Sequence, residues 1–72
     1  MPDFPSRLKD LRKSKSVTQK AMSELLDVEE NHYQRYEYGK TIPNIVALTK
    51  LAEYFNVSTD YLLGLTDKPD RQ

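Results

Sequence analysis

The chain has 72 residues, enough for one domain with a small core, and its 11 basic and 11 acidic side chains balance to a formal net charge of zero. The absence of cysteine excludes disulfides and thiolate metal sites, and a single histidine argues against any other zinc site, so we expect no metal and no cofactor. Because the sequence has neither a run of about 18 apolar residues nor the apolar core of a signal peptide, we expect a soluble cytoplasmic protein without a membrane partner.

The first predicted helix runs from Pro5 or Ser6 to Lys15. Ser6 is the expected N-cap, since serine accepts hydrogen bonds from the first free N–H groups of a helix. One face of this segment is apolar at helical spacing and is expected to enter the core. Its residues are Phe4, Leu8 and Leu11.

A second and a third helix are predicted within the segment QKAMSELLDVEENHYQRYEYG, residues 19–39. Thr18 is the expected N-cap of the second helix, which reaches Leu26, and the third helix covers residues 29–38 and ends at Gly39. Asp27 lies at the corner, where aspartate tolerates a left-handed backbone. Apolar residues occur only where two crossing helices would touch: Met22, Leu26, Val28, Tyr33 and Tyr36. This pattern predicts a helix-turn-helix, whose second helix can enter a DNA major groove.

Two further helices complete the predicted domain, residues 1–66. The fourth helix begins after Asn44 and has the longest apolar stripe, so we expect it to be the central brace. The stripe consists of Ile45, Leu48, Leu51, Ala52 and Phe55. The fifth helix follows the N-cap Ser58 and ends at Gly64, and residues 67–72 are expected to form a frayed tail. Short helices with short links must cover one another, which predicts an all-α fold.

Most of the chain, Arg7 to Gly64, resembles the Cro/CI-type helix-turn-helix regulators, also called the XRE family. The segments that carry the resemblance are RLKDLR, TQ, YEYGKTIPN and LAEYFNVSTDYLLG. The resemblance implies a compact five-helix bundle of the lambda-repressor-like type, with the third helix in the major groove. It further implies that Gln19, Lys40 and Thr41 contact DNA phosphates. Finally, it implies a structural ion pair between Arg12 and Glu37.

The predicted third helix turns a polar face outward. At about 100° per residue, Tyr33 and Tyr36 lie on one side of this helix and the polar residues lie on the other. Arginine can donate two hydrogen bonds to guanine, asparagine and glutamine can do the same for adenine, and glutamate can accept one from cytosine. The Tyr38 hydroxyl, at the helix end, is a further candidate for a phosphate contact. The predicted base-reading residues are Glu30, Asn31, Gln34 and Arg35.

Charge leaves two functions open. Residues 21–31 carry four acidic side chains and no basic one, which is unusual beside DNA, because phosphate attraction supplies most non-specific affinity. The leading hypothesis is a sequence-specific regulator of transcription, a repressor of phage or prophage type, that binds double-stranded DNA as a homodimer. The alternative is a protein-interaction module of the same fold with little or no DNA affinity.

The sequence predicts neither an enzyme nor a small-molecule receptor. It contains no nucleophile–histidine pair, no glycine-rich phosphate loop and no metal-ligand spacing. Apolar residues near the end of the chain are candidates for a dimer contact, although they could equally close the core: Tyr61, Leu62, Leu63 and Leu65.

Overall fold

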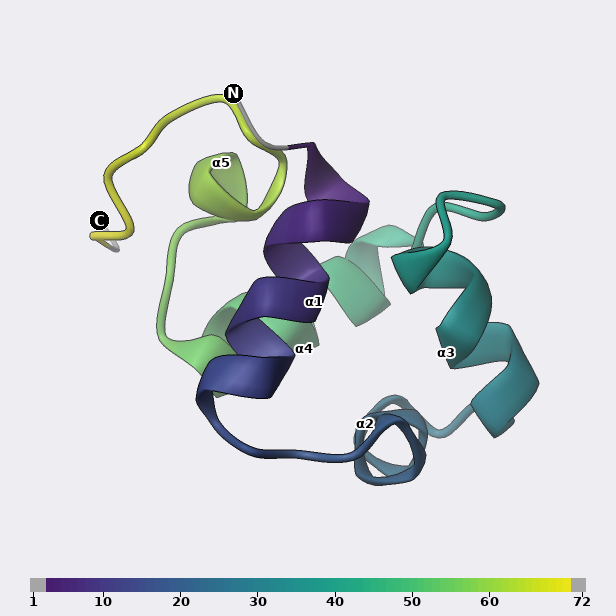
Figure 1. Cartoon of the computed structure of the whole chain (residues 1–72). Helices are drawn as coiled ribbons and strands as arrows, with labels where there is room; N and C mark the ends of the chain where they lie inside the picture. Colours follow the sequence, from purple (N-terminus) through teal and green to yellow (C-terminus); the bar gives the residue numbers. More distant parts are fainter. Residues whose placement is uncertain (1–2, 71–72) are drawn as a thin grey trace.

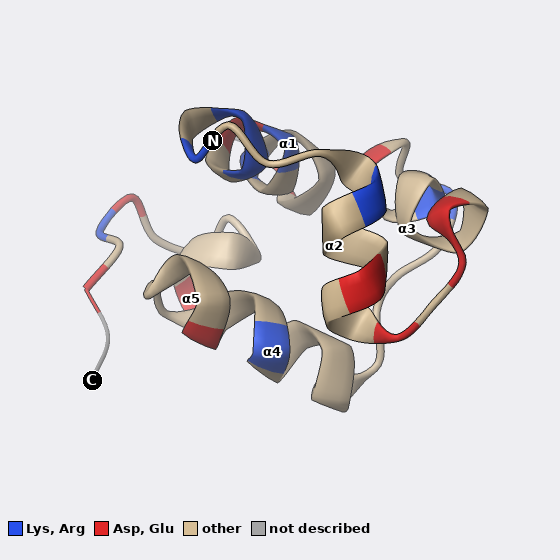
Figure 2. Ribbon diagram, turned by 90° about the horizontal axis from the view of Figure 1, so that it is seen from below, with Lys and Arg blue, Asp and Glu red and all other residues tan. Residues whose placement is uncertain are grey.

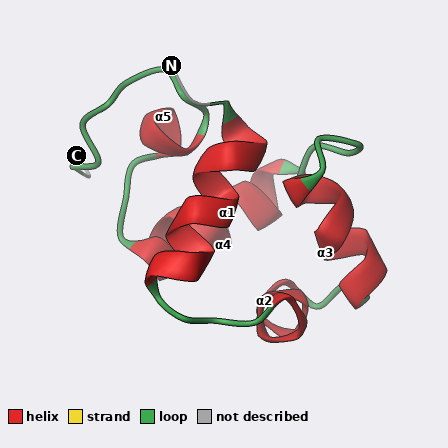
Figure 3. Ribbon diagram, viewed as in Figure 1, coloured by secondary structure: helices red, strands yellow, loops and turns green. Residues whose placement is uncertain are grey.

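The computed structural model describes residues 3–70 as five helices joined by short loops (Figures 1 and 3). The helices are α1 (Phe4–Ser14), α2 (Gln19–Leu26), α3 (Glu30–Glu37), α4 (Ile45–Phe55) and α5 (Thr59–Leu62). No strand occurs within residues 3–70, and the predicted all-α class is confirmed. None of the helices in this part of the chain is long and apolar enough to cross a membrane. The outer ends of the predicted domain and tail, residues 1–2 and 71–72, lie outside the described residues.

All five helices contribute to one shared core. Each supplies one large side chain that is fully buried: Leu8, Met22, Tyr33, Leu51 and Leu62. α1 packs against α3 and α5, α4 packs against α2 and α5, and the most extensive packing joins α2 to α3. In Figure 1, α3 and α5 lie on opposite sides of α1. α4 supplies four buried residues, more than any other helix, and its role as the central brace stays a prediction.

Local capping fixes where four of the helices begin. In each, the side chain before the helix accepts a hydrogen bond from the backbone N–H three residues later; the caps are Asp3, Thr18, Asn44 and Ser58. The prediction that Ser6 caps the first helix is wrong, because Oδ1 of Asp3 accepts the Ser6 N–H at 3.1 Å and starts the helix at Phe4. The same hydrogen bond lowers the pKa of Asp3. α3 begins after Glu29 without a side-chain cap hydrogen bond.

The five helices also end alike. A residue with a left-handed backbone follows each helix, and the next N–H bonds back to a carbonyl five residues earlier, as in the Schellman motif. After α2, for example, Asp27 has a φ of 57° and the Val28 N–H bonds to the Ser23 carbonyl at 3.0 Å. This confirms the predicted left-handed corner between α2 and α3. The left-handed residues are Ser16, Asp27, Gly39, Asn56 and Gly64.

Replacing Ser16 with glycine should raise the free energy of unfolding by up to about 1.5 kcal/mol. Ser16 has a φ of 57°. A left-handed backbone costs a residue with a Cβ about 1–2 kcal/mol, which the greater freedom of glycine in the unfolded chain offsets by about 0.5–1 kcal/mol. Denaturant titration of S16G beside the wild type measures the difference, and N56G serves as a comparator with a smaller gain, since asparagine tolerates this conformation. A loss of stability in S16G would contradict this account of the turn.

The apolar stripe of α4 differs from the predicted one at its first turn. The predicted stripe includes Ile45, yet this side chain is 82% exposed. Leu48 is partly buried, and the buried residues of α4 are Ala47, Leu51, Ala52 and Phe55. Ile45 shares the helical phase of Leu48 and Ala52, but it occupies the first position of α4, where the helix extends beyond the core. Spacing alone does not show where a core ends.

Arg7 is a buried basic side chain, only 5% exposed, near the start of α1. Its guanidinium lies 3.9 Å from the centre of the Tyr61 ring, a cation–π contact. Its Nη1 donates to the carbonyls of Tyr61 and Thr66, both at 3.0 Å. Arg7 therefore fastens α1 to the end of α5 and to the chain that follows it.

The described part of the predicted frayed tail, residues 67–72, is attached to the domain. Nη2 of Arg7 lies 3.3 Å from Oδ1 of Asp67. The Ser58 N–H donates to the Pro69 carbonyl at 3.1 Å. These two contacts hold the segment beside α5, where Figure 1 shows it looping back past the start of α1.

Candidate nucleic-acid interface

The inner face of α3 holds this helix firmly against the rest of the domain. Tyr33 is fully buried, and Tyr36 and Glu37 are nearly so. The two tyrosine rings meet edge to face with their centres 6.1 Å apart. The prediction that Tyr33 and Tyr36 belong to the core is confirmed. With this face fixed, the remaining side chains of the helix point away from the core.

The outer face of α3 carries the predicted base-reading residues. Glu30, Asn31 and Arg35 are exposed, whereas Gln34 is half-buried. Asn31 and Arg35 are four residues apart, about one helical turn, so they project on the same side of the helix. Arginine and asparagine present the donor pairs that read guanine and adenine in a major groove. This face can therefore offer specific hydrogen bonds to base edges.

A buried carboxylate ties α3 to α1 and α2. Glu37 accepts hydrogen bonds from Nε and Nη2 of Arg12, at 2.6 and 3.1 Å, in a two-pronged ion pair. Its Oε2 also accepts the Tyr33 hydroxyl at 2.6 Å, and its Oε1 accepts Nε2 of Gln19 at 3.2 Å. Arg12 further donates to the Val17 carbonyl at 3.0 Å. Each of these polar groups is thus partnered inside the bundle.

The hydrogen bonds around Glu37 hold it ionised. Burial by itself would raise the pKa of Glu37, but the hydrogen bonds from Arg12, Tyr33 and Gln19 outweigh burial and lower it. On the other side of the ion pair, the hydrogen bond to Glu37 raises the pKa of Arg12. Burial, followed by the hydrogen bond to Glu37, raises the pKa of Tyr33 far above its ordinary value. The cluster is therefore one carboxylate, one guanidinium and one neutral phenol at neutral pH.

Two glutamines extend this cluster to the molecular surface. Nε2 of Gln34 donates to Oε1 of Gln19 at 3.2 Å, while Nε2 of Gln19 donates to Glu37. A predicted phosphate contact and a predicted base contact are therefore neighbours: the buried carboxylate holds Gln19, and Gln19 holds Gln34. Each glutamine Nε2 carries two hydrogens, so one N–H of each remains for a bond outward.

The other predicted phosphate contacts follow the carboxyl end of α3. Tyr38 is 64% exposed, Lys40 is exposed and Thr41 is half-buried. The backbone N–H groups of Lys40 and Thr41 both point to the Arg35 carbonyl, at 2.9 and 3.4 Å. The loop is thereby folded back against the end of α3. Tyr38, Lys40 and Thr41 therefore lie together at the carboxyl end of α3. Gln19 contacts the same helix through its hydrogen bonds with Gln34 and Glu37.

His32 makes a polar contact with Tyr36 that the sequence analysis did not predict. Its Nε2 lies 3.1 Å from the hydroxyl of Tyr36, and the two rings meet edge to face with centres 5.3 Å apart. His32 is an exposed residue of α3. The spacing of four residues between His32 and Tyr36 could have suggested this contact.

Acidic side chains gather beside the same helix. Figure 2 shows them over the end of α2, the turn and the start of α3. All of them are exposed: Glu24, Asp27, Glu29 and Glu30. Carboxylates at the start of a helix favour the helix dipole, but they repel phosphates. Phosphates would therefore be contacted more readily at the carboxyl end of α3 than at its first turn.

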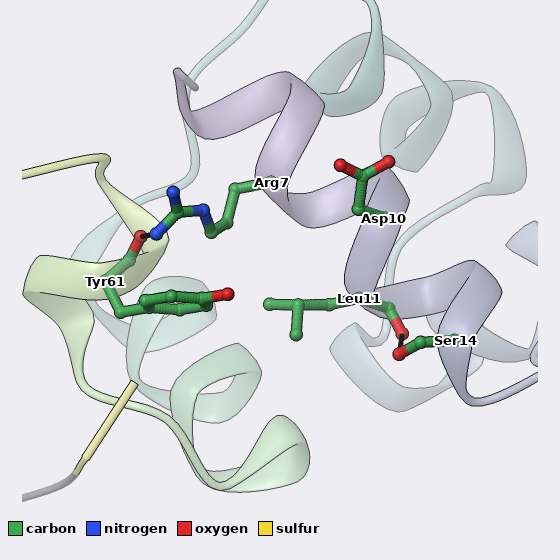
Figure 4. Close-up of a pocket in the computed structure, with 5 residues that line it drawn as sticks. All are labelled: Arg7, Asp10, Leu11, Ser14 and Tyr61. Carbon is green, nitrogen blue, oxygen red and sulfur yellow. Dashed lines mark hydrogen bonds between the residues drawn. The ribbon is translucent and has the colours of Figure 1, made fainter. Parts of the chain in front are cut away.

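A pocket lies away from α3, between α1 and α5 (Figure 4). It is lined by Arg7, Asp10, Leu11, Ser14 and Tyr61. Arg7 uses its hydrogen bonds on backbone carbonyls, and the Ser14 hydroxyl donates to the Leu11 carbonyl at 2.8 Å. Two of the polar residues that line the pocket, Arg7 and Ser14, are therefore already bonded within the domain.

Comparison with known proteins identifies the family. A helix-turn-helix family model matches residues 8–62. YonR of Bacillus subtilis, an HTH-type transcriptional regulator derived from prophage SPbeta, is 43% identical over 60 residues, which cover 83% of this chain and 56% of YonR. The chain spans about half the length of the curated relatives it matches.

Solved structures agree with this match. A transcriptional regulator from Listeria innocua is 35% identical with a TM-score of 0.84, over 86% of this chain and 58% of that chain. The P22 c2 repressor protein, solved in complex with a synthetic operator, is 27% identical with a TM-score of 0.80, over 88% of this chain and 96% of that chain. The chain therefore belongs to the Cro/CI-type (XRE) helix-turn-helix family and has the lambda-repressor-like fold.

Proposed function

We propose that this protein regulates transcription by binding double-stranded DNA in a sequence-specific manner, with α3 in the major groove. The observation that carries the proposal is the polar outer face of α3, which is held on a buried anchor made by Tyr33, Tyr36 and Glu37. Arg35 and Asn31 would read bases, with Gln34 and Glu30 beside them. A protein with this role needs no catalytic group, and it would act in the cytoplasm, where bacterial and phage DNA lies.

The phosphate contacts would flank this helix. We assign Gln19 to one DNA strand and the loop after α3, with Tyr38, Lys40 and Thr41, to the other. Contacts of this kind set the position and orientation of the protein, while base contacts set specificity. The protein would act as a repressor of phage or prophage type. Two similar proteins support this role, the SPbeta prophage-derived regulator and the P22 c2 repressor. A single module of this size buries little surface, so we further propose that two copies bind one operator.

The second candidate function is a protein-interaction module with the same fold. The exposed acidic cluster at the end of α2 and the start of α3 favours it, because these carboxylates would oppose phosphates. The two functions predict different responses to salt. A DNA-binding regulator loses affinity as salt rises, with a slope of log K on log salt of about −0.9 for each phosphate contact.

Selection of bound duplexes from a random DNA pool, followed by fluorescence titration at two salt concentrations, tests the proposal. We expect a recovered consensus with two related half-sites spaced by about one helical turn. We also expect affinity for the consensus to exceed that for a scrambled duplex by about 10³-fold or more. Recovery of no consensus, together with equally weak binding to all duplexes, would favour the interaction module.

Arg35→Ala should reduce the binding free energy for the selected duplex by about 1–3 kcal/mol and relax the preference at one base position. Its melting temperature should stay near that of the wild type, because Arg35 is exposed. Lys68→Ala is the matched control: it removes one exposed charge from the C-terminal segment, distant from α3 in Figure 1, and should leave affinity nearly unchanged. An Arg35→Ala variant with intact specificity but lowered stability would contradict the assigned role.

A further inference from the structure

His32 is a titratable side chain on α3 that the assigned base and phosphate contacts do not include. Its Nε2 lies 3.1 Å from the Tyr36 hydroxyl, and the two rings meet edge to face. Tyr36 is only 3% exposed and packs edge to face on Tyr33, so its ring is fixed in the core. The exposed imidazole is therefore held in place by a rigid partner.

Helical phase places His32 on one flank of the outer face of α3. At about 100° per residue, His32 lies roughly 60° from Arg35 and roughly 160° from Gln34 around the helix axis. Gln34 is bonded to Gln19, which we assign to one DNA strand. A phosphate backbone borders the major groove on each side. With α3 in the groove, His32 would therefore face the second strand, the one assigned to the loop after α3.

Resting on the proposed function, we propose that His32 is a further phosphate-binding residue, positioned by Tyr36, and that it makes DNA affinity rise as the pH falls. Because Nε2 is bonded to Tyr36, Nδ1 is the ring nitrogen left for a contact outside the domain. An imidazole N–H can donate to a phosphate oxygen, and a positive charge on the ring strengthens that hydrogen bond. Histidine ordinarily gains this charge between about pH 8 and pH 5.

The Tyr36 hydroxyl suits both protonation states of the imidazole. Burial raises the pKa of Tyr36, so the phenol keeps its proton. The hydroxyl can donate to Nε2 of a neutral ring, which leaves the ring proton on Nδ1, and it can accept from Nε2 of a charged ring. In both cases Nδ1 carries the hydrogen that a phosphate oxygen needs. Protonation therefore adds charge to the contact without turning the ring away.

Other charged groups near α3 do not change charge in the same pH range. α1 and α2 are the helices that pack most closely on α3, and Arg12 of α1 is closed in the ion pair with Glu37. Carboxylates ordinarily titrate near pH 4, whereas lysine and arginine titrate above about pH 10. His32 is the single histidine of the chain. The remaining charged groups of α2, α3 and the following loop are all exposed: Lys20, Glu24, Asp27, Glu29, Glu30, Arg35 and Lys40.

Fluorescence titrations of the selected duplex at about pH 5.5 and about pH 8, each over a series of salt concentrations, test the proposal. We expect the wild type to bind roughly tenfold more tightly at the lower pH in about 0.1 M salt, the gain from one more neutralised phosphate. Its slope of log K on log salt should steepen by about 0.9 at the same time. Melting curves at each pH establish that every variant folds.

Two substitutions at His32 bracket the wild type. H32Q cannot gain a charge, so it should lose most of the gain in affinity on acidification and keep one salt slope at both pH values. H32K is charged throughout, so it should show near pH 8 the steeper salt slope that the wild type shows only near pH 5.5. Any pH dependence from carboxylates pressed against phosphates would persist in both variants.

Y36F tests the positioning role of Tyr36. This variant keeps the buried ring and loses the hydroxyl that holds Nε2 of His32. We expect its gain in affinity on acidification to lie between those of the wild type and H32Q. A gain equal to that of the wild type would contradict the positioning role.

Two results would overturn the phosphate contact and leave the proposed function intact. An equal gain on acidification in the wild type and H32Q would assign the pH dependence to other groups. A changed consensus, in a selection from random DNA repeated with H32Q, would show that His32 contacts a base. If the wild type binds no duplex specifically at either pH, the proposed function itself fails, and this proposal fails with it.

Discussion

Replacing Glu37 with alanine should lower the free energy of unfolding by about 3–5 kcal/mol, a large part of the stability of a domain this small. The side chain of Glu37 is 1% exposed and that of Arg12 is 13% exposed, so the substitution leaves a nearly buried guanidinium without its carboxylate. It also removes the acceptor of the Tyr33 hydroxyl and of Gln19. Denaturant titration at neutral pH measures the loss. A change below about 1 kcal/mol would show that the ion pair contributes little to stability.

Glu37→Gln is the matched control, because it keeps the shape and one acceptor oxygen but cannot ionise. The pKa of Glu37 in the fold is lowered from its ordinary value of 4.5. A carboxyl with a lowered pKa stabilises the fold fully above its unfolded pKa, and the contribution is lost as the pH falls through the folded pKa. The wild type should therefore lose stability below about pH 4.5 more steeply than Glu37→Gln. Identical acid dependence would contradict the role of Glu37; part of the dependence should persist through Asp3, whose pKa is also lowered.

Tyr33→Ala should lower the free energy of unfolding by about 3–5 kcal/mol. Tyr33 is fully buried at the middle of α3, so its removal opens a cavity between this helix and the rest of the core. The substitution also removes the edge-to-face contact between the Tyr33 and Tyr36 rings. Thermal or denaturant unfolding followed by circular dichroism measures the loss. Because α3 is anchored through this residue, DNA affinity should fall in parallel with the folded fraction.

Tyr33→Phe separates the ring from its hydroxyl. This variant keeps the packing and loses only the hydrogen bond to Glu37, which should lower the free energy of unfolding by about 1.5–3 kcal/mol. Tyr33→Ala must therefore be the more damaging of the two. If both variants lose the same stability, the hydroxyl and not the ring is the anchor of α3.

Local chemistry made most of the fold predictable. Three N-caps, Thr18, Asn44 and Ser58, are predictable because these side chains accept hydrogen bonds from N–H groups in the next turn. The left-handed corner at Asp27 and the helix end at Gly39 follow from backbone preferences of single residues. These features depend on neighbours in sequence, and a single sequence contains them.

Contacts between distant residues were harder to predict. Arg7 is charged and yet buried, one helical turn after Phe4 and one before Leu11. Its partners, Tyr61 and Thr66, are more than 50 residues away. Ile45 has the correct helical phase for burial, but no neighbouring helix covers it. Burial depends on which elements meet, and helical spacing does not report this.

The candidate site was predictable in part. The helical phase of α3 separates the buried tyrosines from Asn31 and Arg35, and this followed from periodicity. The chain of hydrogen bonds from Gln34 through Gln19 to Glu37 could not be predicted from periodicity, because it joins residues on two helices. Because Gln34 donates to Gln19, a substitution at Gln19 should alter the position of Gln34 as well as the phosphate contact proposed for Gln19.

The central claim is that the outer face of α3 faces the bases. NMR spectra of the labelled protein, recorded as the selected duplex is added, test it most directly. The account predicts the largest changes at the side chains of Asn31, Gln34 and Arg35 and at the backbone of Lys40 and Thr41. Changes confined to α1 and α5 around Arg7 and Tyr61, with the signals of α3 unmoved, would contradict it.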